Sequence, residues 1–271
     1  MNKKIKLVLC DIDGTLVNGK RELTQITKQA IKRLKKQGIY FGLASGRPYQ
    51  GVIKKIKEGD IEEDVDVLIT MNGAQLYDCI NDKIYSYFLL EKQWIKEIIE
   101  TYEVLDLNPC VYEGNTLLCK RFEYQCTRSA ENNGLELVLA DPHSYCEKER
   151  EKLLYTLPAS RMEEVEAFSM MHSSQYYKGF KSAPDLFEFT DRRVSKSYGI
   201  EQFCSIHGFT IDECACFGDT TNDIEMLKDC GIGICMANGT DDAKEVSDII
   251  ALSNDEDGVA LMIKELFLND E

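Results

Sequence analysis

Several features that mark whole classes of proteins are scarce or missing in this sequence. Only five of its 271 residues are proline, while 44% are apolar and 29% are charged, which excludes a disordered chain and a fibrous repeat. No stretch approaches the roughly 20 apolar residues of a membrane-spanning helix. The sequence therefore predicts a globular protein, and its length predicts one large domain or two.

Marks of export and of zinc binding are missing as well. The chain starts MNKKIKLVLC and reaches Asp11 after four apolar residues, whereas a cleavable signal needs an apolar segment of about 7–15 residues. Its eleven cysteines include no pair with the CxxC spacing of zinc sites, and the nearest pair is Cys214 and Cys216. We therefore expect a cytoplasmic protein whose cysteines are mostly buried, reduced thiols.

Positive charge is in the minority in this chain. It has 32 lysine and arginine residues against 47 aspartate and glutamate residues, for a net charge of −15. Because this field repels polyphosphate backbones, nucleic acid is not an expected partner. An anionic small molecule would need a local positive centre, provided by a metal ion or by a suitably placed lysine.

Apolar runs alternate with helical patterns at the start of the chain. Unbroken apolar runs predict strands that are covered on both faces, as in a parallel sheet, and they lie in residues 5–10, 39–48 and 65–74. Between them, amphipathic crossover helices are predicted in residues 23–38 and 49–59. The same alternation returns near the end, with strands in 213–236 and 248–253 and helices in 239–247 and 257–267.

The middle of the chain has a different pattern. Asn72-Gly73 and Asn81-Asp82 are hairpin signals, and half-exposed strands and helical patterns follow, among them residues 92–105, 109–114, 176–183 and 186–190. We predict an α/β fold in which a doubly wound, mostly parallel sheet is interrupted by an inserted α+β domain. The predicted division assigns residues 1–82 and 188–271 to the first domain and residues 83–187 to the insertion.

Polar residues follow three of the predicted strands, at the edge where open parallel sheets bind their ligands. They are Asp11 and Asp13, then Ser45, Gly46 and Arg47, and finally Asp219, Asn222 and Asp223. Carboxylates gathered at one edge repel one another unless a cation lies among them. Because the donors are oxygen atoms without a nearby histidine or cysteine, Mg²⁺ is the expected ion, together with a substrate phosphate.

Four short motifs carry a family resemblance. DIDGTL at 11–16, ASGRP at 44–48, VSKS at 194–197 and GDTTNDIEML at 218–227 resemble the signatures of the haloacid dehalogenase-like phosphatases, in the family's order. The insertion after the second motif, together with LITMNGA at 68–74, resembles the Cof-type branch with its large α/β cap. The residue after Lys196 departs from the family pattern, because the usual glycine is Ser197 here.

The resemblance implies a role for each matched residue. Asp11 would be the nucleophile that forms an aspartyl-phosphate, and Asp13 the general acid and base. Dehalogenating relatives need no such acid, so Asp13 favours a phosphatase. Substrate contacts are implied for Ile12, Ser45, Gly46, Lys196 and Asn222; metal ligation for Asp11, Asp219 and the carbonyl of Asp13; and orientation of neighbouring groups for Asp223.

Several alternatives stay open at this point. Each motif alone is an ordinary strand-to-turn junction or helix cap, and only their combination favours a catalytic site. We expect a magnesium-dependent phosphatase of small phosphate monoesters; a phosphosugar mutase and a non-catalytic sensor of phosphorylated ligands are the alternatives. Sugar phosphates rank first among substrates, ahead of nucleotides and phosphorylated cofactors. Arg47 fits a salt bridge as well as a substrate contact, Asn72 fits a turn as well as a place lining the substrate cleft, and the oligomeric state is left open.

Overall fold

The computed structural model describes residues 4–268, so the first three residues of MNKKIKLVLC and the last three of the chain lie outside the description. The chain divides into two compact units. The first contains the chain up to Gly46, Lys55–Tyr85 and the chain from Ser195, and the second contains Arg47–Lys54 and Ser86–Val194. Among the described residues, no helix has the length and the apolar character needed to cross a membrane.

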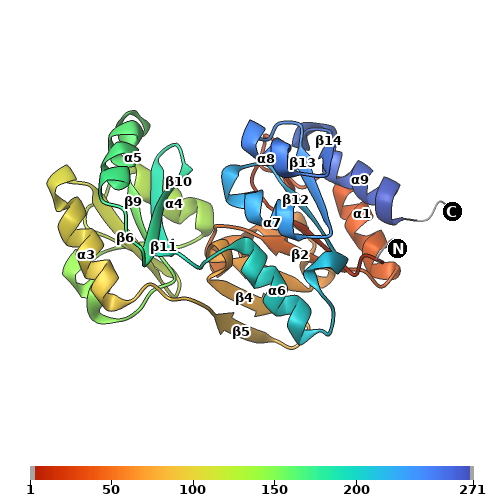
Figure 1. The fold of residues 1–271 in the computed structure, drawn as a ribbon, viewed down its shortest axis with the longest axis horizontal. Helices are drawn as coiled ribbons and strands as arrows, with labels where there is room; N and C mark the ends of the chain where they lie inside the picture. Colours follow the sequence, from red (N-terminus) through yellow and green to blue (C-terminus); the bar gives the residue numbers. More distant parts are fainter. Residues whose placement is uncertain (1–3, 269–271) are drawn as a thin grey trace. The chain divides into compact units, whose positions relative to one another are not determined.

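The first unit is built on an eight-stranded sheet with the strand order β14-β13-β12-β1-β2-β3-β4-β5 (Figure 1). The six strands from β14 to β3 pair in parallel, and β4 pairs antiparallel with β3. The central strands are buried at every residue because apolar side chains cover both faces. The strands are β1 Leu7–Cys10, β2 Tyr40–Ala44, β3 Val67–Thr70, β4 Gln75–Asp78, β5 Lys83–Ser86, β12 Cys214–Gly218, β13 Ile232–Met236 and β14 Ile249–Ala251.

Helices precede or follow the parallel strands of this sheet along the chain. They are α1 Gln25–Lys36, α2 Tyr49–Gly59, of which the residues up to Lys54 group with the second unit, α6 Lys196–Ile206, α7 Ile224–Asp229, α8 Asp241–Val246 and α9 Gly258–Phe267. Thr24 caps α1, since its side chain accepts a hydrogen bond from the amide of Thr27. Helix α1 packs against α9, and α6 packs against α7. From β1 the chain crosses to β2, on one side in the sheet, and from β12 it crosses to β13, on the other side. Since such crossovers are right-handed, the pair α1 and α9 covers one face of the sheet and the pair α6 and α7 covers the opposite face.

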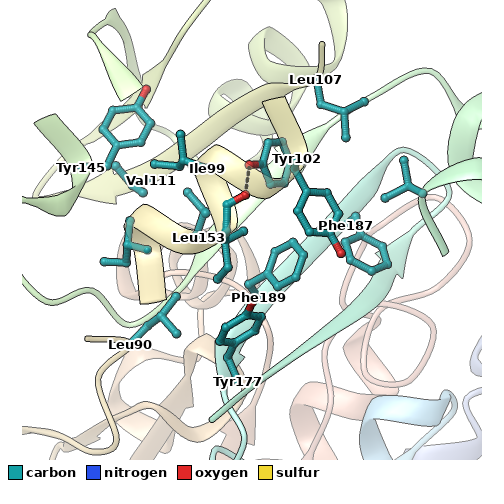
Figure 2. Close-up of a cluster of buried hydrophobic side chains, with 14 of the residues drawn as sticks. Leu90, Ile99, Tyr102, Leu107, Val111, Tyr145, Leu153, Tyr177, Phe187 and Phe189 are labelled. Atoms are coloured by element: carbon teal, nitrogen blue, oxygen red, sulfur yellow. Dashed lines mark hydrogen bonds between the residues drawn. The ribbon is translucent and has the colours of Figure 1, made fainter. Parts of the chain in front are cut away.

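The second unit has a six-stranded sheet in the order β10-β11-β9-β6-β7-β8. Among the described residues of this sheet, β7 and β8 pair in parallel and the other neighbouring strands pair antiparallel. The strands are β6 Asn108–Glu113, β7 Thr116–Cys119, β8 Glu136–Leu139, β9 Leu153–Thr156, β10 Tyr177–Ala183 and β11 Leu186–Asp191, and the helices are α3 Lys92–Tyr102, α4 Tyr124–Asn133 and α5 Met162–Met171. Alternate residues of the strands meet α3 and α5 in an aromatic core, which includes Tyr102, Phe187 and Phe189 (Figure 2).

The predicted fold class, a doubly wound α/β sheet with an inserted α+β part, is confirmed. Helix α2 matches its prediction at both ends, whereas α4 and α5 had no separate prediction. The predicted division between residues 187 and 188 falls inside β11, which is continuous because Phe187 and Phe189 both lie in the core of the second unit. The units themselves divide at Tyr85 and Ser86, and again at Val194 and Ser195.

Candidate active site

The turn after β1 places Asp11 at the carboxyl end of the central strand. Its amide donates a 2.9 Å hydrogen bond to the carbonyl of Phe217 on the neighbouring strand β12. The amides of Leu16 and Val17 both donate to the carbonyl of Ile12, at 3.1 Å, which closes the turn. Because the side chain of Ile12 is fully buried, any substrate contact of this residue is made by its main chain.

Three buried carboxylates gather where β1 and β12 end. Asp11, Asp219 and Asp223 each offer an oxygen atom within 4.8 Å of the others. The buried Nζ of Lys196 lies 2.6 Å from Oδ1 of Asp11 and 2.6 Å from Oδ1 of Asp223. Lys196 begins α6, where the cap Ser195 accepts from the amide of Tyr198, so the helix start brings the ammonium into the cluster.

The remaining carboxylate oxygens of the cluster are held in distinct ways. Oδ2 of Asp223 accepts hydrogen bonds from the amides of Asp219 at 2.9 Å and Thr220 at 3.1 Å. Oδ1 of Asp219 accepts a 2.7 Å hydrogen bond from the hydroxyl of Thr15. Asp223 therefore fixes Lys196 and the loop after β12, while Asp11 and Asp219 are the carboxylates with oxygen atoms left to face a ligand.

The electrostatics of the cluster favour a divalent cation. Three carboxylates against one ammonium leave two negative charges in a buried place. Burial raises the pKa of Asp11 well above its usual value, against the opposing effect of Lys196, and the other two carboxylates raise it further. Burial also raises the pKa of Asp219 to about 6. The same carboxylates raise the pKa of Lys196 above its ordinary value, although burial alone would lower it. A cation among the carboxylates would stabilise their ionised forms.

Asp13 and Gly14 complete the turn. The side chain of Asp13 is exposed and stands outside the cluster of three carboxylates, although its charge adds to the effect of burial on the pKa of Asp219. Gly14 has a φ of +88°, and a Cβ atom there would lie 2.3 Å from Oδ2 of Asp219. Glycine is therefore required both for the conformation and for the close approach of Asp219.

The loops after β2 and β3 are joined by Asn72. Its amide donates a 3.0 Å hydrogen bond to the carbonyl of Ser45, and its side chain accepts from Nδ2 of Asn222 at 3.4 Å. A Cβ atom at Gly46 would lie 2.9 Å from Oδ1 of Asn72. The structure thus brings Ser45, Gly46 and Asn222 together through a residue that the sequence pattern assigned to a turn.

Arg47 follows Gly46 in the chain but groups with the second unit. Its guanidinium donates to Oδ1 of Asn133 at 3.1 Å and to the carbonyl of Asn132 at 3.3 Å.

Three residues of the site have supporting contacts that motif reasoning missed. Thr15 binds Asp219, Asn72 joins two loops, and Asn238 donates a 2.8 Å hydrogen bond to the carbonyl of Gly14. Thr15 and Asn72 stand beside residues that the motifs singled out, so their positions in the sequence could have indicated a role in the site. Asn238 lies 224 residues from its partner, and its sequence surroundings give no comparable signal.

Comparison with known proteins identifies the family of this chain. The family model for haloacid dehalogenase-like hydrolases matches residues 8–263. The chain belongs to this family. A solved haloacid dehalogenase-like hydrolase from Bacteroides thetaiotaomicron is 26% identical and superposes with a TM-score of 0.87, over 97% of this chain and 100% of that one.

Two relatives from Bacillus subtilis are named phosphatases. The 5-amino-6-(5-phospho-D-ribitylamino)uracil phosphatase YitU is 26% identical, covering 98% of this chain and 99% of its own. Phosphatase YwpJ is 25% identical, covering 97% of this chain and 100% of its own. The resemblance to the Cof-type branch is confirmed, and this haloacid dehalogenase-like protein is an enzyme, a phosphatase.

Proposed function

We propose that the enzyme is a magnesium-dependent phosphatase that hydrolyses small phosphate monoesters through an aspartyl-phosphate at Asp11. The observation that carries this proposal is the buried contact of Lys196 with Asp11 and Asp223, beside Asp219. A nucleophilic carboxylate must stay ionised although it is buried, and a fixed ammonium at 2.6 Å favours the ionised form.

The chemistry follows from the two aspartates of the β1 turn. With Oδ1 of Asp11 held by Lys196, Oδ2 attacks phosphorus, and the bond from phosphorus to the ester oxygen breaks. Asp13 gives its proton to the departing oxygen and then removes one from the water that attacks the phosphorus of the aspartyl-phosphate. That second attack releases inorganic phosphate and restores the Asp11 carboxylate. The exposure of Asp13 suits a group that exchanges protons with the leaving group and with water.

The donor set fits Mg²⁺. Asp11 and Asp219 offer carboxylate oxygens, and the predicted third protein ligand, the carbonyl of Asp13, is also an oxygen atom, which matches the preference of Mg²⁺ for few carboxylates plus a substrate phosphate. When bound, Mg²⁺ would offset the two negative charges of the cluster and those of the phosphate. Ser45, Gly46, Lys196, Asn222 and the main chain of Ile12 remain the residues proposed to hold the phosphate oxygens.

The proposed substrates are sugar phosphates, nucleotides and phosphorylated cofactors. The strong negative charge of the chain disfavours polyphosphate polymers and leaves small esters, which the local ammonium and metal can attract. The name of YitU describes a substrate whose phosphate is carried by a ribityl chain. This relative supports a polyhydroxylated leaving group, and sugar phosphates rank first.

The test is phosphate release from a panel of phosphate esters with Mg²⁺. Asp11→Asn is expected to abolish turnover without affecting folding, because an amide of nearly the same shape does not attack phosphorus. Asp60→Asn, an exposed position with a positive φ of 54° that asparagine tolerates, is the matched control. Retained turnover in Asp11→Asn would contradict the proposal, and transfer of the phosphoryl group between sugar hydroxyls without phosphate release would indicate a mutase.

A further inference from the structure

The turn that follows β3 has a left-handed backbone at three consecutive residues. Met71, Asn72 and Gly73 have φ values of +53°, +58° and +102°, and all three are buried. Glycine adopts this region freely and asparagine tolerates it, but a bulky side chain such as that of Met71 seldom does. Strained conformations persist only where their surroundings hold them, and they gather at functional sites. Residues 71–73 are called the strained turn below.

The strained turn packs against the start of α6, which carries Lys196. A Cβ atom at Gly73 would lie only 1.9 Å from the carbonyl oxygen of Ser195 and 3.1 Å from the amide nitrogen of Lys196. Further along α6, a Cβ atom at Gly199 would lie 3.5 Å from Cα of Gly73. The backbone of the turn therefore touches the backbone of the helix, and this contact fixes where Lys196 enters the carboxylate cluster.

Asn72 contacts two other loops of the first unit. Its amide donates a 3.0 Å hydrogen bond to the carbonyl of Ser45, a bond that any residue except proline can make. Oδ1 of its side chain accepts a 3.4 Å hydrogen bond from Nδ2 of Asn222, and a Cβ atom at Gly46 would lie 2.9 Å from the same oxygen. The backbone and the side chain of Asn72 thus have separate contacts, so a substitution can remove one set and keep the other.

The side chain of Asn222 is held at both of its polar ends. Its Oδ1 accepts a hydrogen bond from the hydroxyl of Thr220, and its Nδ2 donates to Asn72. A side-chain amide has two N–H groups, and among residues 4–268 Oδ1 of Asn72 is the acceptor that Nδ2 contacts. The second N–H is therefore available to a ligand. Asn222 is half-buried whereas Asn72 is buried, so a ligand reaches Asn222 and not Asn72.

The orientation of the Asn222 amide decides what it offers to an anion. In the present orientation it offers an N–H donor, which suits a phosphate oxygen. In the reversed orientation Oδ1 of Asn222 would take the place of its Nδ2, and two carbonyl oxygens would face each other at Asn72. The side chain of Asn72 therefore selects the orientation that binds phosphate. Its left-handed backbone gives no reason for this side chain, because glycine adopts that conformation more easily.

We propose that Asn72 is a positioning residue, whose Oδ1 keeps the Asn222 amide turned with an N–H toward the phosphate. This inference rests on the proposed function, in which Asn222 holds a phosphate oxygen. The strained turn gives the side chain of Asn72 a fixed origin, because its contacts with Ser45 and with the start of α6 hold the backbone on two sides. Asn72 then affects the phosphate only through Asn222.

The experiment measures kcat and KM for phenyl phosphate, and Ki for inorganic phosphate, in the full chain with Mg²⁺. Asn72→Gly keeps the left-handed conformation and the backbone bond to Ser45 but removes the acceptor for Asn222. We expect KM and Ki to rise about tenfold, the effect of one hydrogen bond, because the phosphate loses an oriented donor. The temperature of thermal unfolding should stay within a few degrees of the wild-type value.

A double variant separates positioning from a general effect on structure. If Asn72 acts through Asn222, adding Asn72→Gly to Asn222→Ala should raise Ki no further, because there is no amide left to orient. Two independent roles would give additive losses. The matched control is Asp60→Gly, at an exposed residue with a φ of +54°. It places glycine at another left-handed position and should leave kcat, KM and Ki unchanged.

Three results would each overturn the inference: additive losses in the double variant, an unchanged Ki in Asn72→Gly, or loss of folding in Asn72→Gly. If the wild type releases no phosphate from any ester, the proposed function fails. The same variants are then compared by the dissociation constant of inorganic phosphate, measured by calorimetry. Non-additive weakening in that comparison supports the role of Asn72, whereas additive weakening, or a wild type that binds no phosphate, overturns it.

Discussion

Replacement of Lys196 by methionine tests the electrostatics of the catalytic cluster directly. The ammonium lies 2.6 Å from a carboxylate oxygen of Asp11 and 2.6 Å from one of Asp223, and its side chain is 1% exposed. Methionine keeps an unbranched side chain of similar length but removes the charge. The variant therefore leaves two buried carboxylates without their shared cation.

The expected magnitude follows from these contacts. Removing one partner of a buried ion pair costs about 3–5 kcal/mol, because the charge left behind is not compensated. Asp223 keeps its hydrogen bonds from the amides of Asp219 and Thr220, so most of the uncompensated charge is that of Asp11. We expect the free energy of unfolding to fall by about 3–5 kcal/mol.

The assay is urea unfolding followed by circular dichroism, with a chelator present so that a bound metal does not contribute to stability. Lys6→Met is the control, because its ion pair with Glu213 is partly exposed, with side chains 45% and 22% accessible, and such a pair is worth at most about 1 kcal/mol. The double variant with Lys196→Met and Asp11→Asn should recover a substantial part of the loss, since it removes the unpaired charge. A loss below about 1 kcal/mol in Lys196→Met, or a double variant no more stable than the single one, would refute the reasoning.

Three further changes test neighbouring parts of the site. Asp13→Asn should lower kcat at least about a hundredfold for alkyl phosphates, the usual scale of general acid and base catalysis, and less for aryl phosphates, whose leaving groups need no proton; equal losses would contradict the role. Gly14→Ala should destabilise the fold by about 1–3 kcal/mol in thermal unfolding, because its Cβ would lie 2.3 Å from Asp219. Gly38→Ala, with a φ of +73° and open space around it, should cost less, and equal effects would contradict the steric argument. Chelation of divalent ions should abolish phosphate release, Mg²⁺ should restore it, and Ca²⁺ should not, since it tolerates more ligands and longer distances; turnover without divalent ions would exclude a metal-assisted site.

Local patterns were enough to predict the strands that position the cluster. β1 and β12 are unbroken apolar runs that end in acidic residues, and such runs are typical of strands buried on both faces. Because parallel strands bring their carboxyl ends to one edge, the sequence predicted that Asp11 and Asp219 lie at the same edge of the sheet. The prediction for α1 was also close, since Ala30, Ile31 and Leu34 repeat with the helical period and are buried.

The helices and strands of the insertion were harder to predict from the sequence, because its strands are short and only partly covered. The alternation of buried residues in β11 is clear from Phe187 and Phe189, yet the predicted domain boundary cut through this strand. Its neighbour in the sheet, β9, lies about 30 residues earlier in the chain and has no distinctive pattern of its own, so the sequence did not show that β11 is paired there. Helices α4 and α5 lack strong amphipathic patterns, and their existence depends on packing against this sheet.

The sequence by itself determined the family, the succession of the buried strands along the chain and the identity of the acidic residues at their ends, because these depend on local period and on motif chemistry. The tertiary structure alone decided which carboxylates lie beside Lys196, and that Asp223 rather than Asp13 joins the buried cluster. It also decided that Lys152 and Glu188, 36 residues apart, form a buried ion pair. Such pairings depend on strand register and on burial, and charges distant in sequence come into contact only when both sheets have formed.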